Sequence, residues 1–304
     1  MIQHLLDGIL VGSILSLGAI GLTLVMHTLR FANFSHAELL SVGAYAALVF
    51  DGLFGAFYSQ LRSTIEPLSL TWSLILAILF AMIVTGLSAI LIDKLVFRRI
   101  REKGDELSMV FASFGVAMVV RNLISLLFGL KSHLFSNDIA FAIVISRDPM
   151  ILVKPDQVFV LIASLLVMLL FHLVLSRTTF GYALQAVAEN PVLAQITGVN
   201  LSRMFRMIWL IGGSLAALSG IFYGLNNQIN PVIGRDLVLP IFAATIAGGI
   251  GSVYGAVLGG FLVGIASNLA LMILPSGYSP AVPFLIILGV LILRPNGILG
   301  EARA

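Results

Sequence analysis

The chain has 304 residues, of which 59% are hydrophobic and 10% are charged, and its formal net charge is +3. A soluble domain carries about 25% charged residues, so the composition excludes an ordinary soluble protein. The absence of cysteine excludes disulfides and thiolate metal sites.

Several apolar runs are long enough to cross a bilayer, which takes about 20 helical residues. The runs are continuous rather than alternating, which favours helices over a β-barrel. The first run is too long for a signal-peptide core, so we expect it in the mature protein. Clear spans are predicted over residues 5–29, 70–93, 107–130, 157–176 and 207–226.

Three further apolar regions are less regular. They are a short helix over 35–50, a long stretch over 237–274 that is broken at Ala247–Ser252, and a short run over 281–293. The sequence therefore predicts an all-α, polytopic transmembrane bundle of eight to nine spans with broken or short helices, forming a single domain over residues 1–304. We find no convincing internal sequence repeat.

The basic residues near the helix ends predict the orientation of the chain. Alternating from the basic segment 94–103, eleven Lys and Arg residues fall on the cytoplasmic side and five fall outside. The expected cytoplasmic residues are Arg30, Lys94, Arg98, Arg99, Arg101, Lys103, Arg177, Arg203, Arg206, Arg294 and Arg303; those outside are Arg62, Lys131, Arg147, Lys154 and Arg235. This bias predicts an external N-terminus and a cytoplasmic C-terminus.

A cytoplasmic insertion over 177–206 has local signals for two short helices. Thr178 or Thr179 can cap a helix over 181–188, Asn190 can cap a second one that starts at Pro191, and Gly198 can end it. The small side chains of Ala183, Ala186, Ala188 and Ala194 suit close approach to another protein. Two interpretations remain open: a docking hairpin, or a solvated connector between two spans.

Motifs for nucleotide or metal chemistry are absent. None of the four lysines follows a glycine, so the sequence has no P-loop. It also lacks HExxH and GxSxG, and its five histidines have no metal-ligand spacing. We therefore expect neither an enzyme nor a cofactor, and no nucleic-acid partner.

A polar cluster in the segment "RFANFSHAELLSVGAY" contains Asn33, Ser35, His36 and Glu38. Ser35 and Glu38 have the S-x-x-E spacing of a capping box, which predicts the start of a helix near the cytoplasmic interface. Two interpretations remain open. The cluster is either a cap with interfacial polar groups or the lining of the inner mouth of a solute path.

Arg121 lies near the middle of the predicted span 107–130, with Asn122 beside it. An arginine at that depth costs about 2.5 to 3.5 kcal/mol on insertion scales, so it must face a partner group or water. A part in the solute path and a structural pairing with carbonyls or a carboxylate are both open. His172, deep in the span 157–176, is expected to be a hydrogen-bonded packing residue.

Several segments, in chain order, resemble those of one family. "RFANFSHAELLSVGAY" resembles the "NFAHGE" signature of the permeases of branched-chain amino acid ABC transporters, with Ser35 and Ala37 as departures. "GYALQAVAENPVLAQITGVN" is similar to the cytoplasmic coupling loop of that family, and "AGGIGSVYGAVLGG" and "LRPNGILG" are similar to its C-terminal blocks.

The resemblance implies a permease subunit in the bacterial inner membrane, in contact with membrane lipid. It further implies a second permease subunit, two ATP-binding cassette subunits and a periplasmic solute-binding protein as partners. The resemblance places the ATPase-coupling residues in the hairpin: Gly181, Ala186, Glu189, Asn190, Ala194 and Gly198. The departures leave the solute open between branched-chain amino acids and urea, short amides or other small polar solutes. The alternatives to an importer subunit are a stand-alone secondary transporter or channel, which broken helices also permit, and a purely structural membrane partner.

Overall fold

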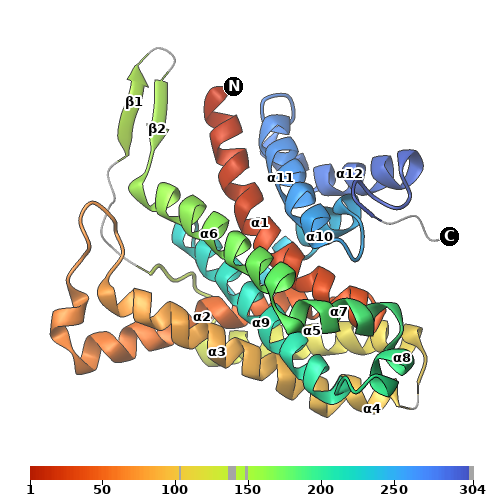
Figure 1. Cartoon of the computed structure of the whole chain (residues 1–304). Coiled ribbons are helices and arrows are strands. Elements are labelled where there is room, and N and C mark those ends of the chain that lie inside the picture. The colour runs from red at the N-terminus through yellow and green to blue at the C-terminus, as the bar shows by residue number, and fades with distance from the viewer. Residues whose placement is uncertain (103, 136–141, 148–149, 301–304) are drawn as a thin grey trace.

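The computed structural model describes residues 1–102, 104–135, 142–147 and 150–300, which are almost entirely helical (Figure 1). Lys103 and Arg303 of the predicted basic set lie outside the described residues. The helices are α1 (Ile2–Leu29), α2 (His36–Phe57), α3 (Trp72–Ile92), α4 (Arg98–Arg101), α5 (Glu106–Phe128), α6 (Pro155–Arg177), α7 (Thr179–Glu189), α8 (Pro191–Ile196), α9 (Leu201–Asn226), α10 (Ile233–Gly248), α11 (Val253–Ala270) and α12 (Ala281–Leu293). A π-helical segment, Asp93–Phe97, joins α3 to α4, and 3-10 turns cover Ser59–Arg62 and Ser276–Tyr278.

The predicted fold class is confirmed. Among the described residues, seven helical segments are long and apolar enough to cross a membrane, namely α1, α2, α3 continued to Arg101, α5, α6, α9 and α11. Helix α12 is a shorter apolar element, and α10 has 16 residues with Pro240 inside it. The predicted helix over 35–50 was too short, because α2 continues to Phe57. The predicted break is present, since Gly249 and Gly251 have φ angles of 110° and 100° that end α10 before α11 begins.

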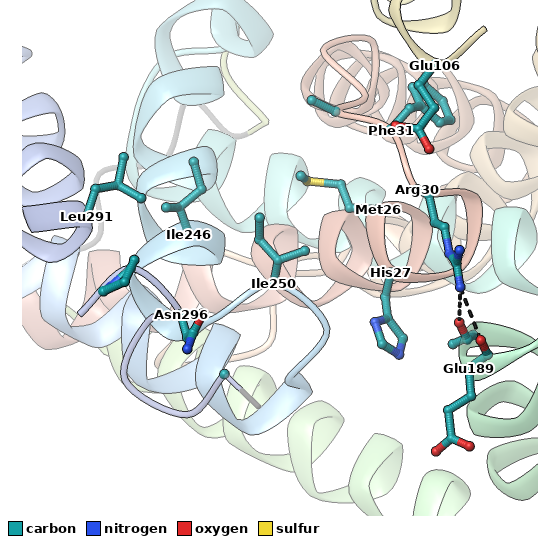
Figure 2. A pocket seen from close by; sticks show the side chains of 14 residues that line it. Met26, His27, Arg30, Phe31, Glu106, Glu189, Ile246, Ile250, Leu291 and Asn296 are labelled. Carbon is teal, nitrogen blue, oxygen red and sulfur yellow. Dashed lines mark hydrogen bonds between the residues drawn. The ribbon is translucent and has the colours of Figure 1, made fainter. Parts of the chain in front are cut away.

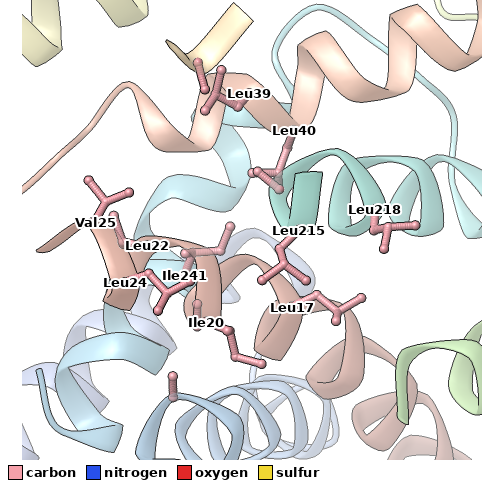
Figure 3. Close-up of a cluster of buried hydrophobic side chains, with 14 of the residues drawn as sticks. Leu17, Ile20, Leu22, Leu24, Val25, Leu39, Leu40, Leu215, Leu218 and Ile241 are labelled. Atoms are coloured by element: carbon pink, nitrogen blue, oxygen red, sulfur yellow. The ribbon is translucent and has the colours of Figure 1, made fainter. Parts of the chain in front are cut away.

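Helix α1 forms the centre of the bundle, and 89% of its most apolar window is buried. Its glycines let neighbouring backbones approach closely. A Cβ atom on Gly12 would lie 2.8 Å from Cα of Phe261 in α11, and one on Gly21 would lie 2.8 Å from the Gly212 carbonyl in α9. Leucine and isoleucine side chains of α1, α2, α9 and α10 fill the space around it (Figure 3).

The chain repeats one arrangement in opposite orientations. Helix α1 starts at the β-hairpin end of the molecule and α9 starts at the α7–α8 end (Figure 1). Each is followed by a non-helical linker of the same length, 30–35 or 227–232, and then by α2 or α10. Helix α1 packs on α11 and α10, as α9 packs on α3 and α2. The structure therefore contains a repeated arrangement for which the sequence shows no convincing repeat.

Both linkers also share a local turn, in which an asparagine side chain accepts a hydrogen bond from the backbone amide two residues later. Asn33 Oδ1 accepts from Ser35 N at 3.2 Å, and Asn230 Oδ1 accepts from Val232 N at 3.1 Å. The same geometry therefore reverses the chain before α2 and before α10.

A short antiparallel hairpin of β1 (Ile143–Arg147) and β2 (Met150–Val153) stands beside the N-terminus (Figure 1). The side chain of Gln3 joins it to α1, because Gln3 Nε2 donates to the Leu152 carbonyl and Gln3 Oε1 accepts from the Leu152 amide, each at 3.1 Å. The sequence did not predict this hairpin.

Candidate functional site

The linker 30–35 brings the polar cluster back to membrane depth. The His36 ring lies against α1, where a Cβ atom on Gly21 would be 2.9 Å from His36 Nε2. Gly21 precedes the end of α1 by eight residues, which is about 12 Å along a helix. His36 and Glu38 therefore do not lie level with the end of α1, which is where the sequence analysis had placed them. That expectation assumed that α2 starts at the level where α1 ends.

The predicted capping box does not form. Ser35 is the N-cap of α2, but its side chain makes no capping hydrogen bond. Instead, Ser35 Oγ donates to Asn33 Oδ1 at 2.7 Å. Glu38 is turned away from Ser35, toward α5. Asn33, Ser35, His36 and Glu38 are all buried, at 2% exposure or less.

Glu38 pairs with Arg121 of α5. Arg121 Nε donates to Glu38 Oε1 at 3.0 Å, and Nη2 donates to the same oxygen. The Glu38 side chain is 2% exposed and that of Arg121 is 26% exposed. Each residue supplies the opposite charge that the other needs at this depth, because an unpaired charge is costly inside a membrane. The structural pairing that the sequence left open for Arg121 is thus present.

The second oxygen of Glu38 faces the start of α10. A Cβ atom on Gly234 would lie 2.7 Å from the Ala37 carbonyl, and the Gly234 amide donates to Ser41 Oγ at 2.9 Å. Among the described residues, Glu38 Oε2 has no hydrogen-bond partner. The positive end of the α10 dipole stabilises a carboxylate there. The sequence did not predict this contact between α2 and α10. The available signal was Gly234, because a glycine in the first turn of a helix allows another backbone to approach closely.

Asn122 does not take part in the Glu38–Arg121 pair. Its side chain is exposed and donates to the Met118 carbonyl of its own helix at 2.7 Å. It lies on an open face of α5 with the exposed side chains of Met118 and Leu126. His172 is hydrogen-bonded as expected, through Nδ1 to the Tyr254 hydroxyl at 2.7 Å.

The two short helices of the predicted hairpin are present. Asn190 Oδ1 caps α8 by accepting from Leu193 N at 3.0 Å, and Pro191 is the first residue of α8. Gly198 has a φ angle of 96°. Thr178 is the N-cap of α7 but makes no capping hydrogen bond, since its hydroxyl donates to the Val174 carbonyl. Thr178 therefore occupies the predicted N-cap position, but the predicted capping hydrogen bond is absent.

The small residues of the hairpin mostly pack inward. Gly181 is buried, because a Cβ atom there would meet the Leu175 backbone, and Ala194 is only 3% exposed. Ala186 is partly buried, whereas Glu189, Asn190 and Gly198 are exposed. The predicted small-residue face is therefore not the exposed face. The outer surface instead carries four large apolar side chains, those of Tyr182, Val192, Leu193 and Ile196.

A cavity of about 800 Å³ opens beside this hairpin, between the end of α1 and the C-terminal segment (Figure 2). Arg30 lies at its edge and donates from Nη2 to the carbonyls of Ala188 at 3.3 Å and Glu189 at 3.1 Å (Figure 2). Glu106 and Asn296 supply further polar groups. No group of three metal-ligating side chains occurs in the described part of the chain.

The chain is similar to permeases over almost its whole length. Residues 4–293 match a family model described as "Branched-chain amino acid transport system / permease component". The chain is 29% identical to the high-affinity branched-chain amino acid transport system permease protein BraD of Pseudomonas aeruginosa, covering 99% of this chain and 96% of that protein. It is 28% identical to LivH of Escherichia coli K12, with the same two coverages. No solved structure matches the chain.

Two more distant comparisons extend the picture. A probable branched-chain amino acid transport permease protein LivH of Methanocaldococcus jannaschii is 29% identical, covering 98% of this chain and 92% of that protein. The fructose import permease protein FrcC of Rhizobium meliloti is 34% identical over 44% of this chain and 38% of that protein. Similarity thus reaches permeases named for a different class of solute.

Proposed function

The chain belongs to the branched-chain amino acid transport permease family, and from this premise we propose that it is one of two permease subunits that form the solute path of an ATP-driven importer. The solute is a branched-chain amino acid or a related small polar molecule, carried from periplasm to cytoplasm. The observation that carries the proposal is the Glu38–Arg121 pair, buried where α2 and α10 begin.

Non-helical backbone at membrane depth is stable only inside protein or beside a water-filled path. Here two linkers enter from opposite ends of the bundle, and the helices that follow them meet at Glu38 and Gly234. Transporters of several folds place a solute between such broken helices. Arg121 is the partly exposed member of the pair, so it is the residue that contacts the path, with Asn33, Ser35 and His36 as buried support.

The open face of α5 suits contact with the second permease subunit. It presents Asn122 and part of Arg121 among apolar side chains, and polar groups at this depth are better placed against protein or water than against lipid. The solute path therefore runs between this face and the partner subunit.

The energy comes from two ATP-binding cassette subunits, because the sequence has no P-loop. They dock on the exposed apolar surface of α8, formed by Val192, Leu193 and Ile196. The positive-inside rule puts this end in the cytoplasm, with the N-terminus in the periplasm of an inner-membrane protein. A periplasmic binding protein delivers the solute to the opposite end.

The test compares the complete importer with this chain alone in proteoliposomes. We expect uptake only with the ATPase subunits and ATP. Ile196→Glu should release the ATPase subunits during purification, whereas Phe57→Glu, which is equally exposed at 77% at the far end of α2, should retain them. Uptake by the chain alone under an ion gradient would overturn the proposal in favour of a secondary transporter.

A further inference from the structure

The aromatic side chains of the linker 30–35 contact three separate helical elements, namely the π-helical segment Asp93–Phe97, α5 and α10. Phe31 lies against Phe97, with ring centroids 5.1 Å apart, and Phe97 stacks on Trp209 of α9. The Phe34 ring lies between two other rings, with its centroid 4.0 Å from Phe114 of α5 and 4.6 Å from Phe242 of α10. Because these aromatic side chains are packed into the bundle, a displacement of the linker must also displace the helices that they contact.

The linker also reaches both members of the buried ion pair. It leads directly into α2, which carries Glu38. The Phe34 amide donates to Ser113 Oγ of α5 at 3.1 Å, and Arg121 lies two turns further along the same helix. Movement of the linker thus acts on Glu38 through the chain and on Arg121 through α5.

Arg30 joins this linker to the hairpin. It ends α1 in the left-handed conformation, with φ 56°, which costs a residue with a side chain about 1 to 2 kcal/mol. Such a conformation persists where surrounding contacts hold it. The contacts here are the two hydrogen bonds from Nη2 to Ala188 and Glu189, the last residues of α7. Carbonyls at a helix end lack helical partners and favour a cation.

We propose that Arg30 is a positioning residue that transmits movement of the α7–α8 hairpin to the linker 30–35, and through it to the Glu38–Arg121 pair. The inference rests on the proposed docking of ATPase subunits at the hairpin. Arg30 contacts the chain at the break between α7 and α8. The carbonyl of Glu189 that it binds belongs to the residue just before Asn190, the N-cap of α8. The adjoining cavity of about 800 Å³ leaves room for the Arg30 side chain and the hairpin to move together.

The experiment measures solute uptake per ATP hydrolysed by the complete importer in proteoliposomes. Arg30→Met keeps most of the side-chain length but removes the hydrogen bonds and the charge. We expect the ATPase subunits to stay bound and to hydrolyse ATP, while uptake per ATP falls at least about fivefold, the lower end of usual coupling between sites. Arg30→Lys, which can donate to the same carbonyls, should recover most of the loss.

The matched control is Arg203→Met, which removes an exposed arginine at the same end of the molecule whose guanidinium makes no hydrogen bond to another described residue. It should transport like the parent. Unchanged uptake per ATP in the Arg30→Met importer would overturn the inference. If the Arg30→Met protein does not accumulate, Arg30→Gln gives the same readout, because its shorter amide does not reach both carbonyls.

The two proposals fail in different ways. If Ile196→Glu retains the ATPase subunits and full uptake, the docking surface is wrong and the inference falls with it. If Ile196→Glu releases them but Arg30→Met transports normally, docking stands and the role of Arg30 alone is overturned.

Discussion

Gly234, the second residue of α10, lies so close to Glu38 of α2 that a Cβ atom on it would be 2.6 Å from Glu38 Oε2. The first turns of two helices that follow linkers from opposite ends of the bundle therefore meet here with no side chain of α10 between them. This contact determines how closely α2 and α10 approach each other at the buried carboxylate.

Gly234→Ala should destabilise the protein, because the added methyl group meets both a carboxylate oxygen and a backbone carbonyl. Overpacking of this kind costs about 1 to 3 kcal/mol. Thermal unfolding of the purified chain in detergent, followed by the fluorescence of the buried Trp209, measures the effect. Gly52→Ala is the control in the same bundle: no atom lies within 4 Å of a Cβ there, so it should be neutral or stabilising. Equal melting temperatures for the two variants would contradict the prediction.

Arg121→Met should be more harmful than the loss of both charges. It leaves Glu38 buried without a counter-charge, which costs about 3 to 5 kcal/mol in known buried pairs. The double variant Glu38→Gln with Arg121→Met removes the unpaired carboxylate and should regain part of the stability. A double-mutant cycle from denaturant unfolding gives the coupling energy. Additive losses would show that the two side chains do not depend on each other.

Asn190→Ala should loosen α8 without unfolding the bundle. Loss of an N-cap side chain costs about 1 kcal/mol, which corresponds to an increase of about fivefold in local opening. Hydrogen exchange of the Leu193 amide, which Asn190 holds at 3.0 Å, reports this opening directly. Asn190→Asp keeps the acceptor oxygen and serves as the control. Protection of Leu193 in the alanine variant would show that the cap is dispensable.

Asp105 makes the start of α5 sensitive to acid. Hydrogen bonds from the side chain and the backbone amide of Ser108 lower the pKa of Asp105 below its usual value. A lowered pKa stabilises the folded state above the unfolded pKa, and this contribution is lost as the pH falls through the folded pKa. The local opening constant obtained from exchange of the Ser108 amide, after correction for the intrinsic pH dependence of exchange, should therefore rise below about pH 4, the usual range of an aspartate. Asp105→Asn keeps the cap without titrating, so it should show no such rise.

Hydropathy was enough to predict five of the seven long apolar helices as clear spans and a break within Ala247–Ser252, because runs of apolar residues and clustered glycines act locally. The Asn190 cap and the start of α8 at Pro191 were predictable for the same reason. Local patterns did not reveal how deep Glu38 lies, since that depends on the linker 30–35 turning back along α1. The partner of Arg121 was likewise invisible, because 83 positions separate the two residues.

The hairpin shows a second limit of reading local patterns. Alanine and glycine can either line an exposed face or allow close packing inside a bundle, and composition does not distinguish these uses. Here Gly181 and Ala194 are buried, while Val192 and Ile196 are exposed. The small residues that suit contact with a partner therefore pack inside the subunit, whereas the large apolar residues that are typical of a core lie on its surface.

The amide of Asn122 on the open side of α5 has a consequence for biogenesis. Without the proposed second permease subunit, a newly made copy would present this amide and part of a guanidinium to acyl chains, which solvate neither. If the proposed second permease subunit covers this side of α5, we expect copies made without it to be the less stable ones in the bilayer.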